Sequence, residues 1–479
     1  MWTFQGAYVD GRFTVPAPKS CDLVKRDPGN LNRTLGNWGR SDTWVSEAVS
    51  CARKAYPDWA WLAVSKRNAF LKKLRSQFKK RRAEIAEVIS SEMGKPLSEA
   101  LAEVETAVRK LEVTCGQASV LFSPEKSFSR ATPRFHPRGV MAVISPFNFP
   151  LQLAVAQVAP ALATGNAVVL KPSELTPFTG QKLAECVHAA GFPKGVFQFL
   201  PGGAETGRPL VSHPEVNGVL FVGSDAVGRK IQEEAGRDSR KICVLEMGGK
   251  NAALLFKDAD LKLALEECLK AAFSTTGQRC NALSRLILHE SVAEKFIHSF
   301  VEGARNFPIG YYRDSKARMG PLVSENALLK FLKYQRLAHQ EGARVLLEGK
   351  KIKFSYPGYY VSPSVHRMEK WKPHSGKTGY RYDEIFGPDV AIYTFRTLEE
   401  AVQIHNDSRY GLAASVFTRR RSVFEACYRS LDVGMLHFNR ATIGSSPHLP
   451  FGGIKASGNH FPAGSFSPYY CVYPVSVQE

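Results

Sequence analysis

Five short apolar runs alternate with stretches of helical periodicity in the first half of the chain. The runs are Gly139–Ser145, Ala167–Lys171, Gly195–Leu200, Gly218–Val222 and Ile242–Glu246. This alternation predicts βαβ units, whose parallel strands form a sheet covered by helices. In such a sheet, ligands bind in a crevice at the carboxyl ends of the strands. The pattern therefore predicts an α/β fold and indicates where functional residues should lie.

A second α/β pattern covers residues 251–439. Strands are expected at Ala252–Phe256, Ser284–His289 and Val390–Phe395, and a helix is expected from Leu261 towards Ser274. No internal repeat, low-complexity tract or flexible linker separates the two patterns. Two large units within one continuous chain are therefore expected.

The rest of the chain is less regular. Residues 1–42 predict an N-terminal hairpin followed by irregular chain. Amphipathic helices are expected from Thr43 to about Leu121, with a stop at Met93–Pro96, because glycine can cap a helix and proline cannot continue it. Trp371–Gly379 predicts a surface loop.

Composition excludes several classes of protein. The chain has 479 residues, of which 44% are hydrophobic, enough for two or more substantial cores. Met1–Phe13 has no continuous apolar stretch, and polar residues with Pro160 interrupt Leu151–Thr164, so neither an export signal nor a membrane span is expected. Nine cysteines without a CxxC pair, and histidines without ligand spacing, predict a cytoplasmic protein with no disulfide framework and no metal.

The net charge of +20 could indicate nucleic-acid binding. In its densest part, Lys66–Arg82, the apolar residues Phe70, Leu71, Leu74 and Phe78 recur at helical spacing, and the basic residues lie mostly elsewhere on the wheel. A solvated helix face explains this better than a nucleic-acid partner. A basic nucleic-acid-binding protein on an inactive enzyme scaffold stays as a remote alternative.

The segment Phe273–Ala282 surrounds Cys280 with Gly, Gln, Arg and Asn. A free cysteine is usually a small buried hydrophobe, so a structural role is the simplest interpretation. The polar neighbours suit a reactive site better, and the Arg279 guanidinium could favour the thiolate. We therefore interpret Cys280 as a nucleophile.

Acyl chemistry by a thiolate also needs a base and a donor for the oxyanion. Glu246 ends the apolar run Ile242–Leu245, just before a pair of glycines. Asn148 follows the run Val140–Ile144 and offers a side-chain amide. Taken singly, the glutamate could be a solvated or paired residue and the asparagine a turn residue.

Seven motifs in one order resemble those of the aldehyde dehydrogenase superfamily and span nearly the whole chain. They are Ser145–Pro150, Asn166–Pro177, Phe221–Ser224, Leu245–Asn251, Gly277–Cys280, Glu384–Pro388 and Pro450–Gly453. The tail Pro450–His460 is most similar to the succinylglutamate-semialdehyde dehydrogenase branch of this superfamily. The resemblance implies a Rossmann-like NAD-binding domain, an α/β catalytic domain and a small β oligomerisation arm.

The implied domains follow this resemblance rather than any linker. They are residues 1–121 and 139–247 for NAD binding, 248–440 for catalysis, and 122–138 with 460–479 for the arm. From the residues alone, Phe122–Arg138 and Ser467–Val477 are β-prone segments that could pair as a small sheet or serve as edge strands within one subunit. The resemblance implies a homodimer or a dimer of dimers.

The resemblance also implies a role for each motif residue. Cys280 attacks an aldehyde, Asn148 and the Cys280 backbone N–H hold the oxyanion, and Glu246 activates water to hydrolyse the thioester. The residues implied to hold NAD are Lys171 and Glu174 at the adenosine ribose, Gly223, Ser224 and Gly228 at the pyrophosphate, and Glu384 with Phe386 at the nicotinamide riboside. Without the other motifs, these would be ordinary ion-pair, turn and core residues.

The cofactor prediction rests on two local features. A GxGxxG fingerprint is absent, but Gly223–Gly228 follows a strand and opens a helix, so its free N–H groups can meet a pyrophosphate. Glu174 can accept hydrogen bonds from ribose hydroxyls and would repel a 2'-phosphate, which favours NAD over NADP.

The expected substrate is an anionic semialdehyde. Arg440 can clamp a carboxylate, and hydroxyl groups such as that of Ser445, flanked by glycine N–H groups, can cradle another. N-Succinyl-L-glutamate 5-semialdehyde is favoured, with glutamate semialdehyde (1-pyrroline-5-carboxylate) and succinate semialdehyde as alternatives. Two further alternatives stay open: an internal ion pair for Arg440, and a CoA-acylating member of the superfamily, although Glu246 favours hydrolysis.

Overall fold

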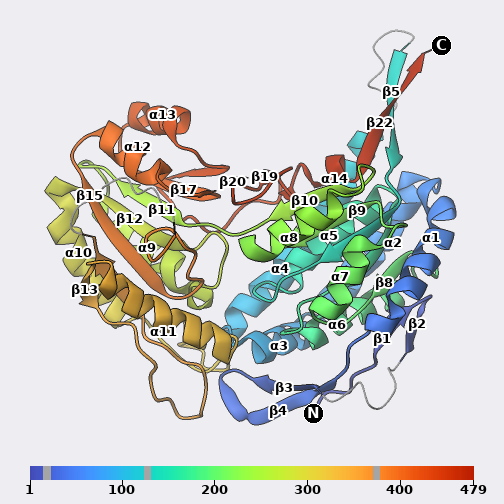
Figure 1. The fold of residues 1–479 in the computed structure, drawn as a ribbon, viewed down its shortest axis with the longest axis horizontal. Coiled ribbons are helices and arrows are strands. Elements are labelled where there is room, and N and C mark those ends of the chain that lie inside the picture. Colours follow the sequence, from blue (N-terminus) through green and yellow to red (C-terminus); the bar gives the residue numbers. More distant parts are fainter. Residues whose placement is uncertain (15–22, 123–130, 369–370, 372–377, 479) are drawn as a thin grey trace.

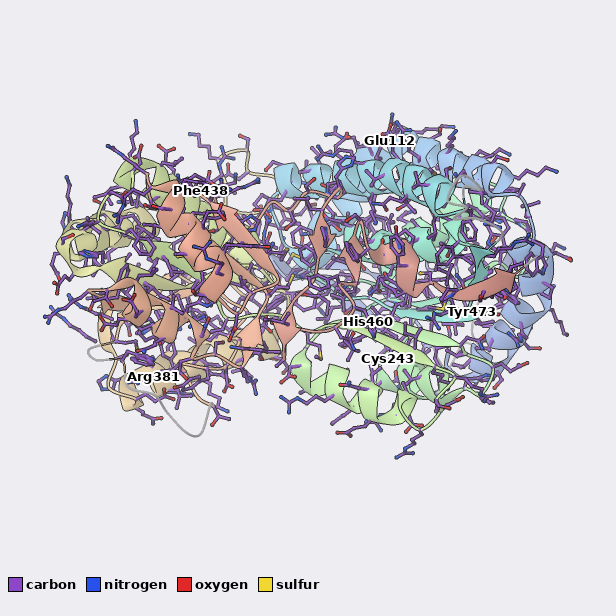
Figure 2. The ribbon with its side chains drawn as sticks, turned by 90° about the horizontal axis from the view of Figure 1, so that it is seen from above. Glu112, Cys243, Arg381, Phe438, His460 and Tyr473 are labelled. Atoms are coloured by element: carbon purple, nitrogen blue, oxygen red, sulfur yellow. The ribbon has the colours of Figure 1, made fainter. Side chains whose placement is uncertain are left out.

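The chain forms two α/β halves that lie side by side (Figure 1). The structure is a computed structural model that describes residues 1–14, 23–122, 131–368, 371 and 378–478. Each half is built around a seven-stranded sheet. In Figure 2, seen from above, Phe438 marks one half and Tyr473 marks the arm of the other.

The first sheet has the strand order β10-β9-β6-β7-β8-β1-β2. Its strands are β10 (Ile242–Glu246), β9 (Gly218–Val222), β6 (Val140–Ile144), β7 (Ala167–Lys171), β8 (Phe197–Phe199), β1 (Ala7–Val9) and β2 (Arg12–Thr14). The strands from β10 to β8 are parallel, so the five apolar runs predicted this part of the sheet correctly. β1 and β2 extend it as the predicted N-terminal hairpin.

Helices cover both faces of the first sheet, because the buried side chains of each strand point alternately to either side. One face packs against α2 (Val64–Lys80), α3 (Arg82–Met93), α4 (Leu97–Leu121), α5 (Gln152–Ala163) and α6 (Pro177–Ala189). The other packs against α1 (Val45–Ala60), α7 (Ala204–Ser212) and α8 (Asp225–Ala235). On α2, Leu71, Leu74 and Phe78 are buried and the lysines are exposed, which confirms the predicted amphipathic helix.

The second sheet has the strand order β13-β14-β15-β12-β11-β17-β18. Its strands are β13 (Arg344–Leu347), β14 (Ser364–Arg367), β15 (Asp389–Phe395), β12 (Leu283–His289), β11 (Asn251–Leu255), β17 (Ala413–Phe417) and β18 (Met435–Phe438). All neighbours are parallel except β13 and β14. α9 (Leu261–Phe273) and α10 (Glu290–Arg305) cover one face, and α11 (Glu325–Gln340), α12 (Leu398–Asn406) and α13 (Arg421–Ser430) cover the other.

Four two-stranded ribbons complete the fold. β3 (Leu23–Asp27) pairs with β4 (Asn30–Trp38), so the expectation that the chain after the first hairpin is irregular was wrong. The other ribbons are β5 (Ala131–Pro137) with β22 (Val472–Gln478), β16 (Tyr410–Gly411) with β20 (Ile454–Lys455), and β19 (Pro450–Phe451) with β21 (Ala463–Gly464), the last followed by α14 (Ser467–Tyr470).

The ribbon of β5 and β22 projects from the first half as an arm (Figure 1). Its antiparallel pairing confirms that the two β-prone segments form a small sheet. The part of the first segment at 123–130 lies outside the described residues, as do most of the predicted loop at 371–379 and Cys21. A role of the arm in assembly stays a prediction.

The edge of the first sheet at β10 is covered by a distant segment. Asn459 donates from its backbone N–H to the Leu245 carbonyl and accepts from the Leu245 N–H through Oδ1 at 2.8 Å. Met247 N–H donates to the carbonyl of Ser457. The labels of His460 and Cys243 mark this region in Figure 2. The strand that ends in Glu246 is thus held on both edges.

No helix among the described residues is both long and apolar enough to cross a membrane. In the same part of the chain, no group of three or more His, Cys, Asp or Glu side chains is placed to hold a metal ion.

Gly94 provides a test of the predicted helix stop. It ends α3 with a φ of 85°, and a Cβ there would lie 2.5 Å from Pro321 Cγ. We expect Gly94→Ala to lower the free energy of unfolding by about 1–3 kcal/mol, because alanine meets both strain and a clash. Gly116, in the middle of α4 with open space around it, is the control. Gly116→Ala should raise the free energy of unfolding by about 0.5–1 kcal/mol; equal effects in urea unfolding would contradict the prediction.

Candidate active site

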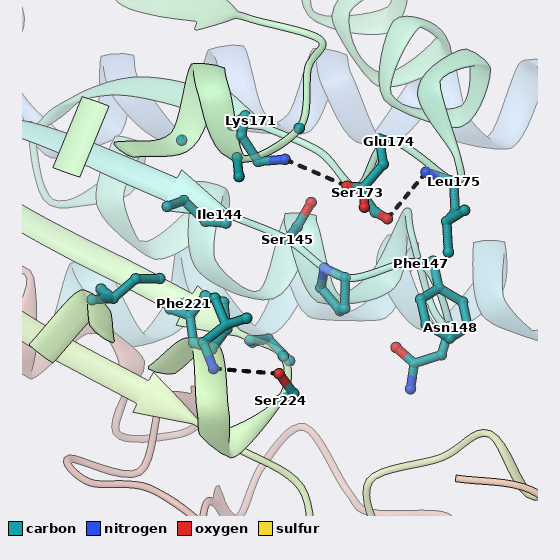
Figure 3. A pocket seen from close by; sticks show the side chains of 18 of the residues that line it. Ile144, Ser145, Phe147, Asn148, Lys171, Ser173, Glu174, Leu175, Phe221 and Ser224 are labelled. Atoms are coloured by element: carbon teal, nitrogen blue, oxygen red, sulfur yellow. Dashed lines mark hydrogen bonds and ion pairs between the residues drawn. The ribbon is translucent and has the colours of Figure 1, made fainter. Parts of the chain in front are cut away.

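A cavity of about 1070 Å³ lies where the carboxyl ends of the first sheet face loops of the second half. This exceeds the roughly 300–1,000 Å³ of most small-molecule sites. Figure 3 shows its first-sheet wall, with Asn148 after β6, Lys171 at the end of β7, Glu174 after β7, and Ser224 before α8. The residues predicted from the sequence that line the cavity are Asn148, Lys171, Glu174, Gly223, Ser224, Glu246, Cys280, Glu384 and Phe386.

Cys280 follows a turn with an uncommon backbone. Thr275, Thr276 and Gly277 have φ values of 54°, 59° and 66°. At Gly277 a Cβ would lie 2.2 Å from the carbonyl oxygen of Gly387, so this position needs glycine. Threonines in the left-handed region cost about 1–3 kcal/mol each, so the surrounding structure must hold this turn in place.

Asn251 supports the far side of the same loop, and sequence reasoning gave it no role. Its Nδ2 donates to the carbonyl oxygens of Cys280 at 2.8 Å and Ala282 at 2.9 Å. Its Oδ1 accepts from the Ala413 N–H at 3.0 Å. The only available signal was the position of Asn251 in the motif that contains Glu246.

Glu246 and Cys280 are both buried and line the same cavity, and their side chains lie close enough for each to shift the pKa of the other. Burial raises the pKa of Glu246 to about 8, and the charge of Glu384 adds to this effect. Burial and the neighbouring Glu246 carboxylate raise the pKa of Cys280 well above its usual value. At neutral pH, therefore, both groups are mainly protonated in the free protein.

Arg279 does not stabilise a thiolate, so that expectation was wrong. Its Nη2 is 3.1 Å from Oε2 of Glu99, and its guanidinium lies over the Phe149 ring at 4.9 Å. The partner Glu99 is 180 residues away in the sequence, and this is why the pairing could not be foreseen.

Three buried polar atoms of cavity residues have no hydrogen-bond partner in the described part of the chain. They are Ser145 Oγ, Asn148 Oδ1 and Glu246 Oε1. Leaving a buried polar atom unpaired costs about 1–3 kcal/mol, so these atoms are typical of a wall that receives a polar ligand.

The loop from Gly223 to Gly228 follows β9 and opens α8, as predicted, but the Gly223 N–H is not free. Gly223 N–H donates to the carbonyl of Glu246 at 3.0 Å, and Ser224 Oγ accepts from Val227 N–H as the N-cap of α8 (Figure 3). Gly228 does not line the cavity; a Cβ there would lie 2.3 Å from Met247 Sδ, so its small size serves helix packing.

Lys171 and Glu174 lie beside each other in the wall, with 4.0 Å between Nζ and Oε2 (Figure 3). Lys171 Nζ donates to the carbonyls of Pro172 at 2.6 Å and Gly202 at 2.8 Å. Burial lowers the pKa of Lys171 to about 8. The Glu174 side chain is 54% exposed and is therefore free to accept from a ligand.

Glu384 and Phe386 form the opposite wall. Glu384 Oε1 accepts from the Gly249 N–H at 3.0 Å, and burial raises the pKa of Glu384 to about 7, although the Lys330 charge opposes this. Phe386 has a φ of 60° and meets Phe147 edge to face at 5.8 Å. Lys330 was missed, because one lysine on an amphipathic helix gives no sequence signal.

The two predicted substrate residues lie outside the wall of this cavity. Arg440 is exposed, and its Nη2 donates to the carbonyl of Gly444 at 3.1 Å. Ser445 Oγ contacts Met435 Sδ at 3.6 Å, and Met435 packs against Cys280. A role for either residue in substrate binding stays a prediction.

The fold and the cavity are those of a two-sheet α/β enzyme with its site at the strand ends. The sequence matches the aldehyde dehydrogenase family over residues 27–471, and the chain belongs to this family. This confirms the family and the fold class predicted from the seven motifs.

Similar proteins include the N-succinylglutamate 5-semialdehyde dehydrogenase of Hahella chejuensis, 31% identical over 99% of this chain and 96% of the relative. The alpha-ketoglutaric semialdehyde dehydrogenase of Bacillus subtilis is 35% identical over 92% of this chain and 91% of the relative. Among solved structures, betaine aldehyde dehydrogenase from Staphylococcus aureus in complex with NAD⁺ has a TM-score of 0.92 at 28% identity, covering 99% of this chain and 97% of that one.

The coupling of the buried acids gives a test that needs no substrate. The Glu384 charge raises the pKa of both Glu246 and Cys280, and Glu384 is itself ionised above about pH 7. Glu384→Gln should therefore shift the pH profile of Cys280 alkylation by iodoacetamide to lower pH, as measured by mass spectrometry of the Cys280 peptide. Glu174→Gln is the control, because Glu174 also lines the cavity but is not among the charges that shift the pKa of Glu246 or Cys280. An unshifted profile in Glu384→Gln would show that the charges are not coupled.

Proposed function

We propose that this protein catalyses the NAD-dependent oxidation of an anionic semialdehyde to a carboxylic acid through a thioester on Cys280. The observation that carries the proposal is that the buried Cys280 thiol, the buried Glu246 carboxyl and the Asn148 amide line one cavity. Nucleophile, base and oxyanion donor are the three groups that acyl transfer requires.

The donor groups of the cavity fit a dinucleotide. Glu174 offers a carboxylate to ribose hydroxyls, Gly223 and Ser224 present the N-terminus of α8 to a pyrophosphate, and Glu384 with Phe386 would hold the nicotinamide riboside. The exposed Glu174 carboxylate favours NAD over NADP, because it would repel a 2'-phosphate. When bound, NAD supplies the hydride acceptor.

The chain's own residues perform the remaining steps. Glu246 accepts the thiol proton as the Cys280 sulfur bonds to the aldehyde carbon, and the Asn148 amide with the Cys280 backbone N–H holds the resulting oxyanion. After loss of the hydride, the carbon is a thioester. Glu246 first releases the proton of the thiol to solvent and then, as a carboxylate again, takes a proton from water while the water oxygen bonds to the thioester carbon. The carbon–sulfur bond then breaks, the acid leaves, and Glu246 returns its proton to the Cys280 sulfur. A base in the cavity favours this hydrolysis over transfer to CoA.

The substrate favoured by the proposal is N-succinyl-L-glutamate 5-semialdehyde. Its support is the sequence similarity of Pro450–His460 to that branch, and the path of residues 439–446 from exposed Arg440 to Ser445 beside Met435. Similar proteins named above act on more than one semialdehyde, so glutamate semialdehyde and succinate semialdehyde are the alternatives to test.

We also infer the organisation that goes with this function. The first half, 1–121 with 139–247, would bind NAD, and 248–440 would carry the catalytic cysteine. The segments 122–138 and 460–479, which include the β5–β22 arm, would join subunits in a homodimer or a dimer of dimers. A cytoplasmic location is proposed from the cysteine pattern.

Separate variants should divide the two chemical steps. Cys280→Ala should lower aldehyde oxidation by roughly 10⁴-fold or more while NAD still binds. Glu246→Gln should lower turnover by roughly 10²- to 10⁴-fold and let the thioester accumulate. Steady-state and single-turnover kinetics of the two variants measure these effects, and normal oxidation by Cys280→Ala would refute the mechanism.

The pH dependence of the wild-type protein tests the base. Because Glu246 acts as a base with a pKa of about 8, wild-type turnover should rise from pH 7 to 9, as measured by steady-state kinetics.

The carboxylate anchor is tested by Arg440→Ala. Loss of a charged hydrogen bond, at about 1.5–3 kcal/mol, should raise KM for the anionic semialdehyde roughly 10- to 100-fold and leave KM for propanal unchanged. Arg429→Ala, an exposed arginine on α13, is the matched control. An unchanged KM in Arg440→Ala, or a higher kcat/KM for propanal than for all three anionic candidates, would exclude the anchor.

A further inference from the structure

Behind the cavity, the first turns of α4 and Lys95, two residues before the helix, carry a buried ionic network. Lys95 and Glu103 are paired at 2.8 Å, and both side chains are fully buried. Lys95 Nζ also donates to the backbone carbonyl of Asn148 at 2.5 Å. Glu103 uses its other oxygen to accept from the N–H groups of Leu151 at 2.9 Å and Gln152 at 3.2 Å. The turn that carries Asn148 is therefore held at its carbonyl and again at the start of α5.

Glu99 lies one turn earlier on the same face of α4. It accepts from the Thr275 N–H at 3.1 Å and from the Thr275 hydroxyl, and it pairs with Arg279 at 3.1 Å. Arg279 Nε donates to Thr275 Oγ1 at 2.8 Å. These contacts account for the left-handed conformation of Thr275, and they fix the turn that leads to Cys280.

The Phe149 ring connects the two supports. Lys95 Nζ lies 3.8 Å from the ring centroid, and the Arg279 guanidinium lies 4.9 Å from it. Cation–π contacts of this kind are strongest where the cation is desolvated, as Lys95 is. A shift of the Asn148 turn would thus be transmitted to the Cys280 turn through one ring.

Stability alone does not explain the Lys95–Glu103 pair. A buried ion pair is often no more stable than apolar residues of equal volume, since desolvation offsets the attraction. What apolar residues could not provide is a directed bond to the Asn148 carbonyl and an acceptor for two N–H groups at the start of α5. We propose that Lys95, held by Glu103, is a positioning residue that fixes the Asn148 amide against the Cys280 thiol, and that α4 is their common support. This inference rests on the roles given to Asn148 and Cys280 in the proposed function.

The test uses p-nitrophenyl acetate, because it probes the nucleophile and the oxyanion donor without a cofactor. The Cys280 sulfur bonds to the acetyl carbon as the bond to nitrophenolate breaks, so released nitrophenolate reports acylation. Lys95→Met should lower the acylation rate about 10- to 100-fold, the effect of a misplaced or missing donor. Glu112→Gln is the control: it removes a carboxylate from the outer side of α4 (Figure 2), where Glu112 pairs with Arg75 and is 59% exposed. It should leave the rate within about 2-fold.

A double-mutant cycle separates positioning from general damage. If Lys95 acts through Asn148, Lys95→Met should cost less than about 3-fold when Asn148→Ala is already present. An equal loss in both backgrounds, or a folded Lys95→Met protein with wild-type acylation, would overturn the proposal. Lys95→Met combined with Glu103→Gln avoids an unpaired buried carboxylate and is the second variant. Failure of both variants to fold would show a structural pair and would also overturn the proposal.

The ester assay also separates this inference from the proposed function. A wild-type protein that is acylated at Cys280 but oxidises no aldehyde would contradict the dehydrogenase proposal, and the cycle would still decide the role of Lys95. A wild-type protein without acylation would remove the basis of both.

Discussion

Burial of the Glu246 carboxyl against the Cys280 thiol is the interaction on which the rest of the site depends. In water these groups would ionise independently. Here burial raises both pKa values, and the protonation state of each group affects the pKa of the other. The resting pair is nearly neutral, so the cavity can be closed from solvent without leaving a bare charge inside it.

Such a pair needs rigid surroundings, because a small displacement removes its benefit. The parallel sheet provides Glu246 at a strand end, and the second half provides Cys280 on a strained turn. Two carboxylates of α4 support the two turns: Glu103 pairs with Lys95 behind the Asn148 turn, and Glu99 pairs with Arg279 beside the turn that leads to Cys280. The two halves are therefore joined behind the cavity by directional bonds as well as by apolar packing.

Much of this arrangement could be predicted from the sequence. Apolar runs predicted the parallel strands of the first sheet to within two residues, but in the second sheet they missed β14, β17 and β18. The rule that strand ends carry the ligand site placed Asn148, Lys171, Gly223 and Glu246 on one cavity. Local patterns failed where the partner is distant. Arg279 was assigned to the thiolate because its partner Glu99 belongs to a helix far away in the sequence, and Lys330 looked like any exposed helical lysine. The β3–β4 hairpin was missed because its strands are rich in polar residues, so pairing rather than periodicity defines them.

The covering of β10 by Ser457–Asn459 has a consequence for how the chain is made. The contact between Leu245 and Asn459 spans 214 residues, so a nascent chain completes the first sheet's other strands long before this edge is paired. During that interval β10 is an open edge, the kind of surface that recruits other strands. The strand that carries Glu246 is thus the last of its sheet to be protected, and a polypeptide interrupted in its final tenth would be prone to aggregate rather than merely inactive.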